Sequence, residues 1–195
     1  MAGLSGLRIE DVKDYETPCF MISKKAVKEQ FTKIRKVADQ VAYSFKTNPD
    51  KSIALFLKAI GSTFSVSSIE EAKVLKEAVG DLSDAFYVNP AANEEEFKTV
   101  SRLGIQRFVL NSKGQLKELE KSGAGDVRVL LRLNTDVRVK GVYGNRSLGM
   151  KKDELIEAAV GLKCIGLHNH LATQNNDFDS WKANLDEICL VIKRL

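Results

Sequence analysis

The stretch "VAYSFKTNPDKSIALFLKAIGSTFSVSSIEEAKVLKEAV", residues 41–79, decides the fold because strand-like and helix-like patterns alternate along it. Two short runs rich in Val, Phe and Tyr, at 41–48 and 62–68, have the length and composition of strands. A segment with apolar residues at helical spacing follows each run. Ser68, with Glu71 three positions later, forms a capping-box pattern that predicts the start of a helix. The stretch therefore predicts two consecutive βα units.

The same alternation continues to the end of the sequence. Four more apolar runs of strand length follow, at 85–90, 106–112, 127–134 and 164–170. Helices are predicted over 24–39, 50–60, 68–79, 93–103, 113–122, 151–161 and 177–195. Strands that recur about every 20 residues with helices between them favour a parallel sheet. We therefore expect an α/β protein with about six βα units.

Such units can close in two ways, as a doubly wound open sheet or as a (β/α) barrel of the TIM type. A doubly wound sheet usually carries a glycine-rich phosphate loop, and the sequence contains neither G-x-G-x-x-G nor a P-loop pattern. Barrel enzymes instead collect polar residues at the C-terminal ends of several strands. Such residues end the predicted strands here: Lys46, Ser65, Asn89, Asn111, Arg132 and His168. The pattern favours a barrel domain over residues 1–195, with about six of eight units and a lead-in of about 40 residues.

Composition excludes several classes of protein. The 30 basic residues are interleaved with 26 acidic ones, as in "KKDE" (151–154), which indicates solvated helix faces and not a nucleic-acid surface. The three cysteines are scattered, which fits reduced thiols. No apolar run approaches the ~20 residues of a membrane helix, and the first residues lack the order of a signal peptide. We therefore expect a cytoplasmic protein with no membrane or nucleic-acid partner.

Side-chain parity along the strands predicts where the chemistry gathers. Because successive side chains point to opposite faces of a strand, Lys46 shares a face with Ala42 and Ser44. The large aromatic residues of the same run take the other face, which suits packing against helices. His168 and His170, the only two histidines of the protein, also share a face. In a barrel, Lys46, Arg132 and the two histidines would therefore converge on one mouth.

Each of these residues also has a simpler explanation. Lys46 could be a strand end that reaches water, or a shielded amine that attacks a carbonyl to form a Schiff base. Arg132 could contact a ligand anion or form a structural ion pair. The H-x-H pair could pack in the structure or bind a metal, but further metal ligands are not evident. No metal site is therefore predicted.

Taken in order, the motifs resemble those of the fold-type III pyridoxal-phosphate decarboxylases, which include the diaminopimelate, ornithine and arginine decarboxylases and have an alanine-racemase-like barrel. "YSFKTN" (43–48) is similar to the family's Y-x-x-K-x-N segment, which carries the cofactor lysine. "VLLRLNTD" (129–136) is similar to its LRxNP strand, and "GLHNHLATQ" (166–174) to its GLHxHxGSQ strand. "TPCFMISKKAVKEQF" (17–31) is similar to the segment that leads into the barrel.

The resemblance implies a carboxy-lyase that decarboxylates diaminopimelate or a related basic amino acid such as ornithine. It implies that Lys46 holds pyridoxal 5'-phosphate as a Schiff base and that His170 stacks on its ring as a second catalytic residue. Four further residues would lie near the cofactor: Glu71, Arg132, His168 and Thr173. It also implies a homo-oligomer, or a second chain that completes the barrel.

The sequence departs from the family pattern at several points. Ser65 stands where the family has an aspartate, "RSLGM" (146–150) replaces the SKFG segment, and "ATQ" (172–174) replaces GSQ. The family's glycine-rich phosphate loop, its EPGR segment and its C-terminal β-domain do not occur in these 195 residues. Two functions therefore stay open: a decarboxylase that needs a completing C-terminal part, or a non-catalytic pyridoxal-phosphate-binding or regulatory relative. A (β/α) fragment without a ligand is a third.

Overall fold

The computed structural model describes residues 13–195 apart from 17, 136, 138–147, 163 and 172–176. In this part of the chain six strands form one sheet, in which every neighbouring pair is parallel. The strands are β1 (Ala42–Ser44), β2 (Thr63–Val66), β3 (Phe86–Tyr87), β4 (Arg107–Leu110), β5 (Arg128–Arg132) and β6 (Cys164–His168). Their order in the sheet is their order in the sequence. A doubly wound sheet would reverse this order at a switch point, so the arrangement confirms the barrel type.

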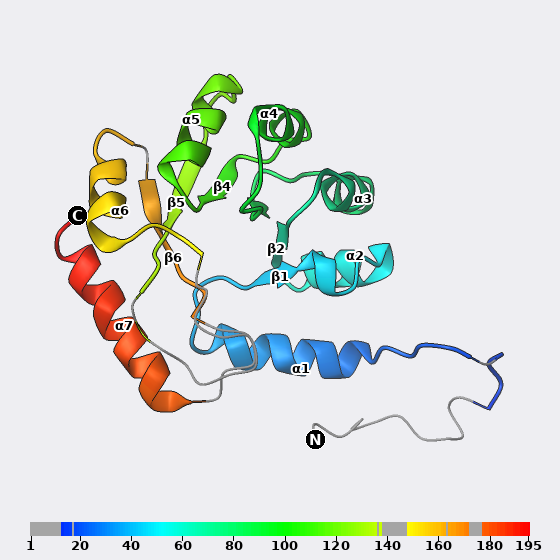
Figure 1. The fold of residues 1–195 in the computed structure, drawn as a ribbon. Coiled ribbons are helices and arrows are strands. Elements are labelled where there is room, and N and C mark those ends of the chain that lie inside the picture. Colours follow the sequence, from blue (N-terminus) through cyan, green and yellow to red (C-terminus); the bar gives the residue numbers. More distant parts are fainter. Residues whose placement is uncertain (1–12, 17, 136, 138–147, 163, 172–176) are drawn as a thin grey trace.

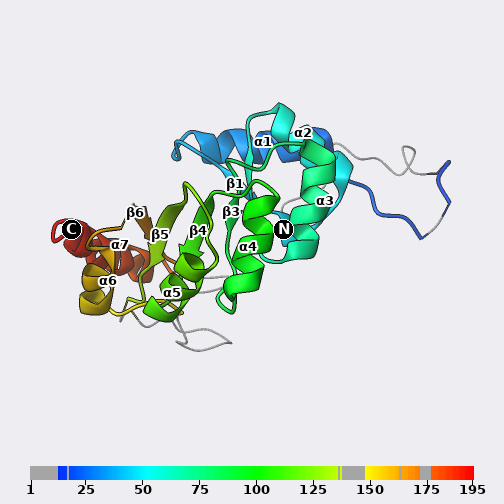
Figure 2. The same ribbon diagram turned by 90° about the horizontal axis from the view of Figure 1, so that it is seen from above.

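The predicted helices form between the strands. They are α1 (Lys24–Arg35), α2 (Lys51–Ala59), α3 (Ile69–Val79), α4 (Glu94–Arg102), α5 (Lys113–Lys121), α6 (Lys152–Ala159) and α7 (Phe178–Ile192). The sheet curls, and helices α2 to α6 cover its outer side (Figure 1), while Figure 2 shows the strands side by side from above. The curled sheet with its helices is thus the larger part of a (β/α) barrel.

Side-chain caps fix where the helices begin. Ser68 accepts a hydrogen bond from the backbone N–H of Glu71, as the capping-box pattern predicts. Asn93 does the same for Glu96 at the start of α4, and Ser112 for Gln115 at the start of α5. Three consecutive βα connections therefore end in the same type of cap.

The hydrophobic core lies between the outer face of the sheet and the helices. The residues on this face are large and buried, among them Phe45 directly after β1 and Phe64, Tyr87, Phe108 and Leu131 in the strands. Phe45 and Phe64 meet edge to face, with ring centroids 6.4 Å apart. Helix residues complete the core, including Leu75, Phe97, Val100, Leu119 and Leu155. The burial of this aromatic face leaves the smaller and more polar residues on the inner side of the sheet.

One detail of the expected first strand is wrong. The pattern predicts a strand over 41–48, but β1 ends at Ser44 and Lys46 lies in a single 3-10 turn, Phe45–Thr47. The strand stops because the chain must enter α2 almost at once, where Asp50 accepts hydrogen bonds from the N–H groups of Ser52 and Ile53. The turn nevertheless keeps Phe45 in the core and Lys46 exposed.

None of the helices in the described residues combines the length and the apolar character that a membrane span requires. Cys19 and Cys189 are exposed free thiols.

Candidate functional site

A cavity of about 690 Å³ lies on the inner side of the sheet, at the C-terminal ends of the strands. We call it the inner cavity. Residues from all six strands and from the turns that follow them line it, and its polar lining comprises Ser44, Lys46, Ser65, Ser67, Arg132, His168 and His170. Lys46, Arg132, His168 and His170 therefore line one cavity, as strand parity predicts.

The charges in the inner cavity have one sign. Lys46 and Arg132 are cationic, and no aspartate or glutamate occurs among the described residues that line the cavity. Burial lowers the pKa of His168 to about 4, and the positive charge of Arg132 and the neighbouring His170 contribute to this. Burial also lowers the pKa of His170, together with the charges of Arg132 and Lys46. Both histidines are therefore neutral at pH 7 while the lysine and arginine give the cavity a positive potential.

Arg132 and His168 form a pair on neighbouring strands. They lie opposite each other in the register of β5 and β6, and both side chains reach the inner cavity. The side chain of Arg132 is 7% exposed, and its Nη1 donates a hydrogen bond of 3.2 Å to Oδ1 of Asn111. Within the described residues, Nε of Arg132 and Nδ1 of His168 are buried without a hydrogen-bond partner. These two nitrogens are polar groups that a ligand or small rearrangement could satisfy.

A close backbone approach holds the end of β5. The N–H of Met150 donates to the carbonyl of Arg132, and the N–H of Asn134 donates to the carbonyl of Met150. Gly149 has a φ of +118°, and a Cβ on it would lie 2.5 Å from the carbonyl oxygen of Arg132. Only glycine fits this position without displacing the backbone that carries Arg132. The backbone at position 149 of "RSLGM" therefore requires glycine. Leu148 beside it lines the inner cavity.

Of the expected cofactor residues, Glu71 is described but lies outside the lining of the inner cavity. Its carboxylate accepts hydrogen bonds from the N–H of Ser67 at 2.8 Å and from the Ser67 hydroxyl at 3.0 Å. Ser67 does line the cavity, so Glu71 supports the wall and does not form it. Thr173 lies outside the described residues.

Gln115 lies behind the cavity wall and is not among the residues that the motifs indicate. It is 6% exposed, and its Oε1 accepts hydrogen bonds from the N–H and the side-chain amide of Asn111 at 2.9 and 3.1 Å. Asn111 in turn contacts Arg132. The available signal was the pattern S-x-x-Q over 112–115, which belongs to the same class of caps as Ser68 and Glu71.

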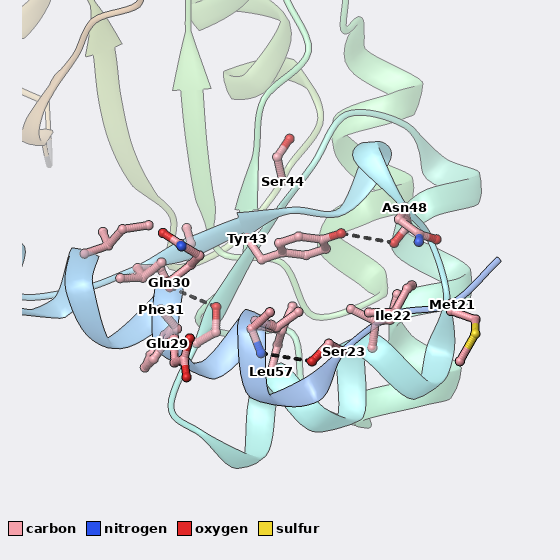
Figure 3. Close-up of a pocket in the computed structure, with 17 residues that line it drawn as sticks. Met21, Ile22, Ser23, Glu29, Gln30, Phe31, Tyr43, Ser44, Asn48 and Leu57 are labelled. Carbon is pink, nitrogen blue, oxygen red and sulfur yellow. Dashed lines mark hydrogen bonds between the residues drawn. The ribbon is translucent and has the colours of Figure 1, made fainter. Parts of the chain in front are cut away.

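A second hollow, which we call the α1 groove, lies on the other side of β1 between α1 and α2 (Figure 3). Its volume is about 630 Å³ and its lining is mostly apolar, including Val27, Phe31, Tyr43 and Leu57. None of the candidate site residues that the structure describes lines the groove. Among the described residues no group of three or more potential ligands could hold a metal ion. The candidate chemistry therefore lies in the inner cavity.

Comparison with known proteins places this arrangement in a family. Residues 24–195 match the family model described as pyridoxal-dependent decarboxylase, pyridoxal binding domain. The chain belongs to this family. The match confirms the resemblance seen in the sequence, and at the level of the family it confirms pyridoxal phosphate as the cofactor. The site residues expected from the motifs fall within the matched range.

Individual relatives agree with the family. The chain is 28% identical over 190 residues to the lysine/ornithine decarboxylase of Selenomonas ruminantium, covering 94% of this chain and 47% of that protein. It is 23% identical over 136 residues to antizyme inhibitor 1 of Pongo abelii, covering 67% of the chain and 30% of that protein. The chain thus spans half or less of the length of these relatives.

A solved structure shows the same fold. The crystal structure of diaminopimelate decarboxylase from Helicobacter pylori, complexed with L-lysine, superposes with a TM-score of 0.81 at 18% identity. The match covers 94% of this chain and 52% of that one. At this identity the likeness supports the fold alone, and it confirms the barrel-type arrangement of the six βα units.

Proposed function

We propose that the inner cavity binds pyridoxal phosphate with Lys46 as the point of covalent attachment, and that the domain serves the decarboxylation of a basic amino acid. One observation carries the proposal: Lys46, Arg132, His168 and His170 line a single cavity without an acidic residue among its described lining residues. The cavity volume of about 690 Å³ lies within the range of ordinary cofactor sites.

The residues present fit this cofactor. A phosphate-bearing aldehyde is anionic, and the cationic lining of the inner cavity attracts it. The amine of Lys46 is exposed to the cavity, where it can attack an aldehyde carbon. The lowered pKa of His170 leaves its ring neutral at pH 7, so it can stack on an aromatic cofactor without adding a positive charge near Arg132. When bound, pyridoxal phosphate supplies an electron sink for the loss of CO₂.

Four further residues take supporting roles in the proposal. Arg132 presents positive charge to the cofactor, and His168 lies beside it as a neutral ring. Glu71 holds Ser67 in the wall, so its contribution to the cofactor is indirect in this arrangement. For Thr173 we propose a place near the cofactor, as its motif implies. We further propose that residues 1–195 belong to one cofactor domain, with about the first 40 residues as its lead-in.

The names of two relatives support the proposed substrate class. The Selenomonas relative is named a lysine/ornithine decarboxylase, and the Helicobacter structure is a diaminopimelate decarboxylase holding L-lysine. These compounds share an α-amino acid head and an amine at the far end of the side chain. We therefore propose diaminopimelate, ornithine or lysine as the substrate.

Release of CO₂ from labelled substrates tests the activity. The full natural protein that contains these residues is incubated with pyridoxal phosphate and with diaminopimelate, ornithine, lysine or arginine in turn. We expect release from at least one of them, and loss of release in the Lys46→Ala variant. A matched variant of an exposed lysine on α2, Lys58→Ala, is expected to keep the wild-type rate. Absence of release from all four substrates would contradict the enzymatic function.

A second function has support from one feature of the cavity. Ser65 lines the inner cavity where the family pattern has an aspartate, and one relative is named an inhibitor of antizyme and not an enzyme. A non-catalytic relative would bind pyridoxal phosphate, or keep only the fold, without turnover. Cofactor binding without CO₂ release would favour this function, and restored release in a Ser65→Asp variant would show that the serine limits catalysis.

We also propose that the domain associates with a second copy of itself or with a second chain. In the described sheet β1 and β6 each have a neighbour on one side only. Helix α7 exposes Phe178, Leu185 and Ile192, which are 77%, 56% and 56% exposed and recur at helical spacing. Exposed strand edges and apolar stripes of this kind favour association. Sedimentation at several concentrations tests this, and a monomer at every concentration would contradict it.

A further inference from the structure

The caps that start α3, α4 and α5 share a second contact. In each, the side chain at the third helical position reaches back to a residue that lies between the end of the preceding strand and the helix cap. Glu71 binds Ser67, and Glu96 accepts a hydrogen bond of 2.8 Å from the side-chain amide of Asn89. At α5 the partners are Gln115 and Asn111. Among these three connections, α5 alone uses an amide in place of a carboxylate.

The amide at α5 belongs to a chain of hydrogen bonds that ends at the cavity. Nε2 of Gln115 donates to the carbonyl of Asn89 at 2.8 Å, which fixes which end of the amide faces Asn111. Its Oε1 accepts from both nitrogens of Asn111, which leaves Oδ1 of Asn111 facing Nη1 of Arg132 at 3.2 Å. Gln115, Asn111 and Arg132 are 6%, 8% and 7% exposed. The chain is therefore buried and directional along its whole length.

The chemistry of an amide is essential at both positions. A glutamate at 115 could accept from Asn111 but could not donate to Asn89. An aspartate at 111 could accept from Arg132, but it would place a negative charge against the guanidinium. The neutral oxygen of Asn111 instead holds the guanidinium in place and leaves its positive charge uncompensated. This agrees with a cavity whose described lining contains no acidic residue.

We propose that Asn111 and Gln115 are positioning residues that hold Arg132 as an oriented, uncompensated cation for the negative charge of the ligand. The proposal rests on the proposed function, because the ligand it names is pyridoxal phosphate. Neither residue lines the inner cavity, so both act through Arg132.

Two isosteric variants and one control test this role in the full natural protein. Gln115→Glu removes the donor to Asn89, and Asn111→Asp adds a charge beside Arg132, while each keeps the size of the side chain. Ser112→Ala removes the cap of the same helix and leaves the amide chain intact, so it reports destabilisation of α5 alone.

The first readout needs no cofactor. Hydrogen exchange of the Arg132 Nε–H is followed by ¹⁵N NMR of the ligand-free protein, with the signal assigned from its loss in Arg132→Gln. Because this group is buried, we expect its exchange to be slow in the wild type. We expect about tenfold faster exchange in Gln115→Glu and unchanged exchange, within twofold, in Ser112→Ala.

The second readout is the dissociation constant of pyridoxal phosphate from an absorbance titration. We expect it to rise about tenfold in Asn111→Asp, because the new carboxylate neutralises Arg132, and to stay within twofold of wild type in Ser112→Ala. If the wild type binds the cofactor, the proposed function stands. The positioning role would then be overturned by wild-type affinity in Asn111→Asp or by wild-type exchange in Gln115→Glu. Absence of binding by the wild type would refute the proposed function itself.

Discussion

The two faces of the sheet differ in what they contribute. The outer face carries Phe45, Phe64, Tyr87 and Phe108, which are at most 3% exposed and pack against the helices. The inner face carries serines, the lysine, the arginine and the histidines around the open cavity. Residues adjacent in sequence therefore serve different purposes: Phe45 is buried in the core, and Lys46 next to it lines the inner cavity. Substitutions on the outer face should therefore lower the free energy of unfolding, and those on the inner face should change cofactor binding or the pH dependence of stability.

The largest expected effect on stability comes from the outer face. Phe45→Ala removes a ring that is 0% exposed and packs edge to face on Phe64, so we expect the free energy of unfolding to fall by about 3–5 kcal/mol. Urea denaturation followed by circular dichroism measures this. On the inner face, Ser44→Ala should change stability by less than ~0.5 kcal/mol. A small loss for Phe45→Ala would remove the distinction between the faces.

The next effect concerns the backbone that supports Arg132. Gly149→Ala forces a Cβ to within 2.5 Å of the Arg132 carbonyl at a positive φ, and we expect it to destabilise the protein by about 3 kcal/mol. Gly161→Ala is the matched control, since Gly161 has a φ of +77° with open space around it. It should cost about 1 kcal/mol. Equal costs for the two variants would show that backbone strain and not the close approach matters at Gly149.

His168 on the inner face should make the free energy of unfolding depend on pH. The pKa of His168 is lowered from 6.5 to about 4, so between these values the unfolded chain binds more protons than the folded one. The free energy of unfolding should therefore fall as the pH drops from 6.5 to 4, by on the order of 2–3 kcal/mol from this residue. Denaturation at several pH values measures the fall. A His168→Gln variant with the same slope as the wild type would contradict this origin.

The smallest effect is expected where β1 borders the α1 groove. The hydroxyl of Tyr43 donates to the carbonyl of Asn48 over 3.5 Å and accepts from the Thr47 hydroxyl at 3.2 Å, and both are exposed contacts that contribute little. Tyr43→Phe should change the free energy of unfolding by less than ~0.5 kcal/mol and leave cofactor affinity unchanged. A change of more than 1 kcal/mol would show that this hydroxyl supports the first strand.

Sequence patterns predicted the division between the faces because it follows from the two-residue period of strands. The aromatic residues beside Lys46 predicted which face of the sheet packs against the helices. The polar residues at the strand ends predicted where the cavity opens. The helix starts at Ser68 and Asn93 followed from their caps. The early end of β1 was not predicted, because it depends on how the chain enters α2 at Asp50.

The chain of hydrogen bonds from Gln115 to Arg132 could not be read from the sequence. It joins the loop after β3, the residue after β4 and the end of β5, which the parallel pairing of these three strands brings together. Glu71 shows the opposite case: its motif points to the cofactor, while the structure ties its carboxylate to Ser67. Motif similarity indicates the candidate residues, and the structure shows which of the described ones line the inner cavity.

Reduction with borohydride in the presence of pyridoxal phosphate tests the central claim most directly. The protein is mixed with the cofactor and reduced, and the labelled peptide is mapped by mass spectrometry. We predict a pyridoxyl group on Lys46, its absence in Lys46→Ala, and full labelling in the Lys58→Ala control. A protein that takes up no label at Lys46, or takes it up equally at exposed lysines of the helices, would contradict the assignment of the inner cavity.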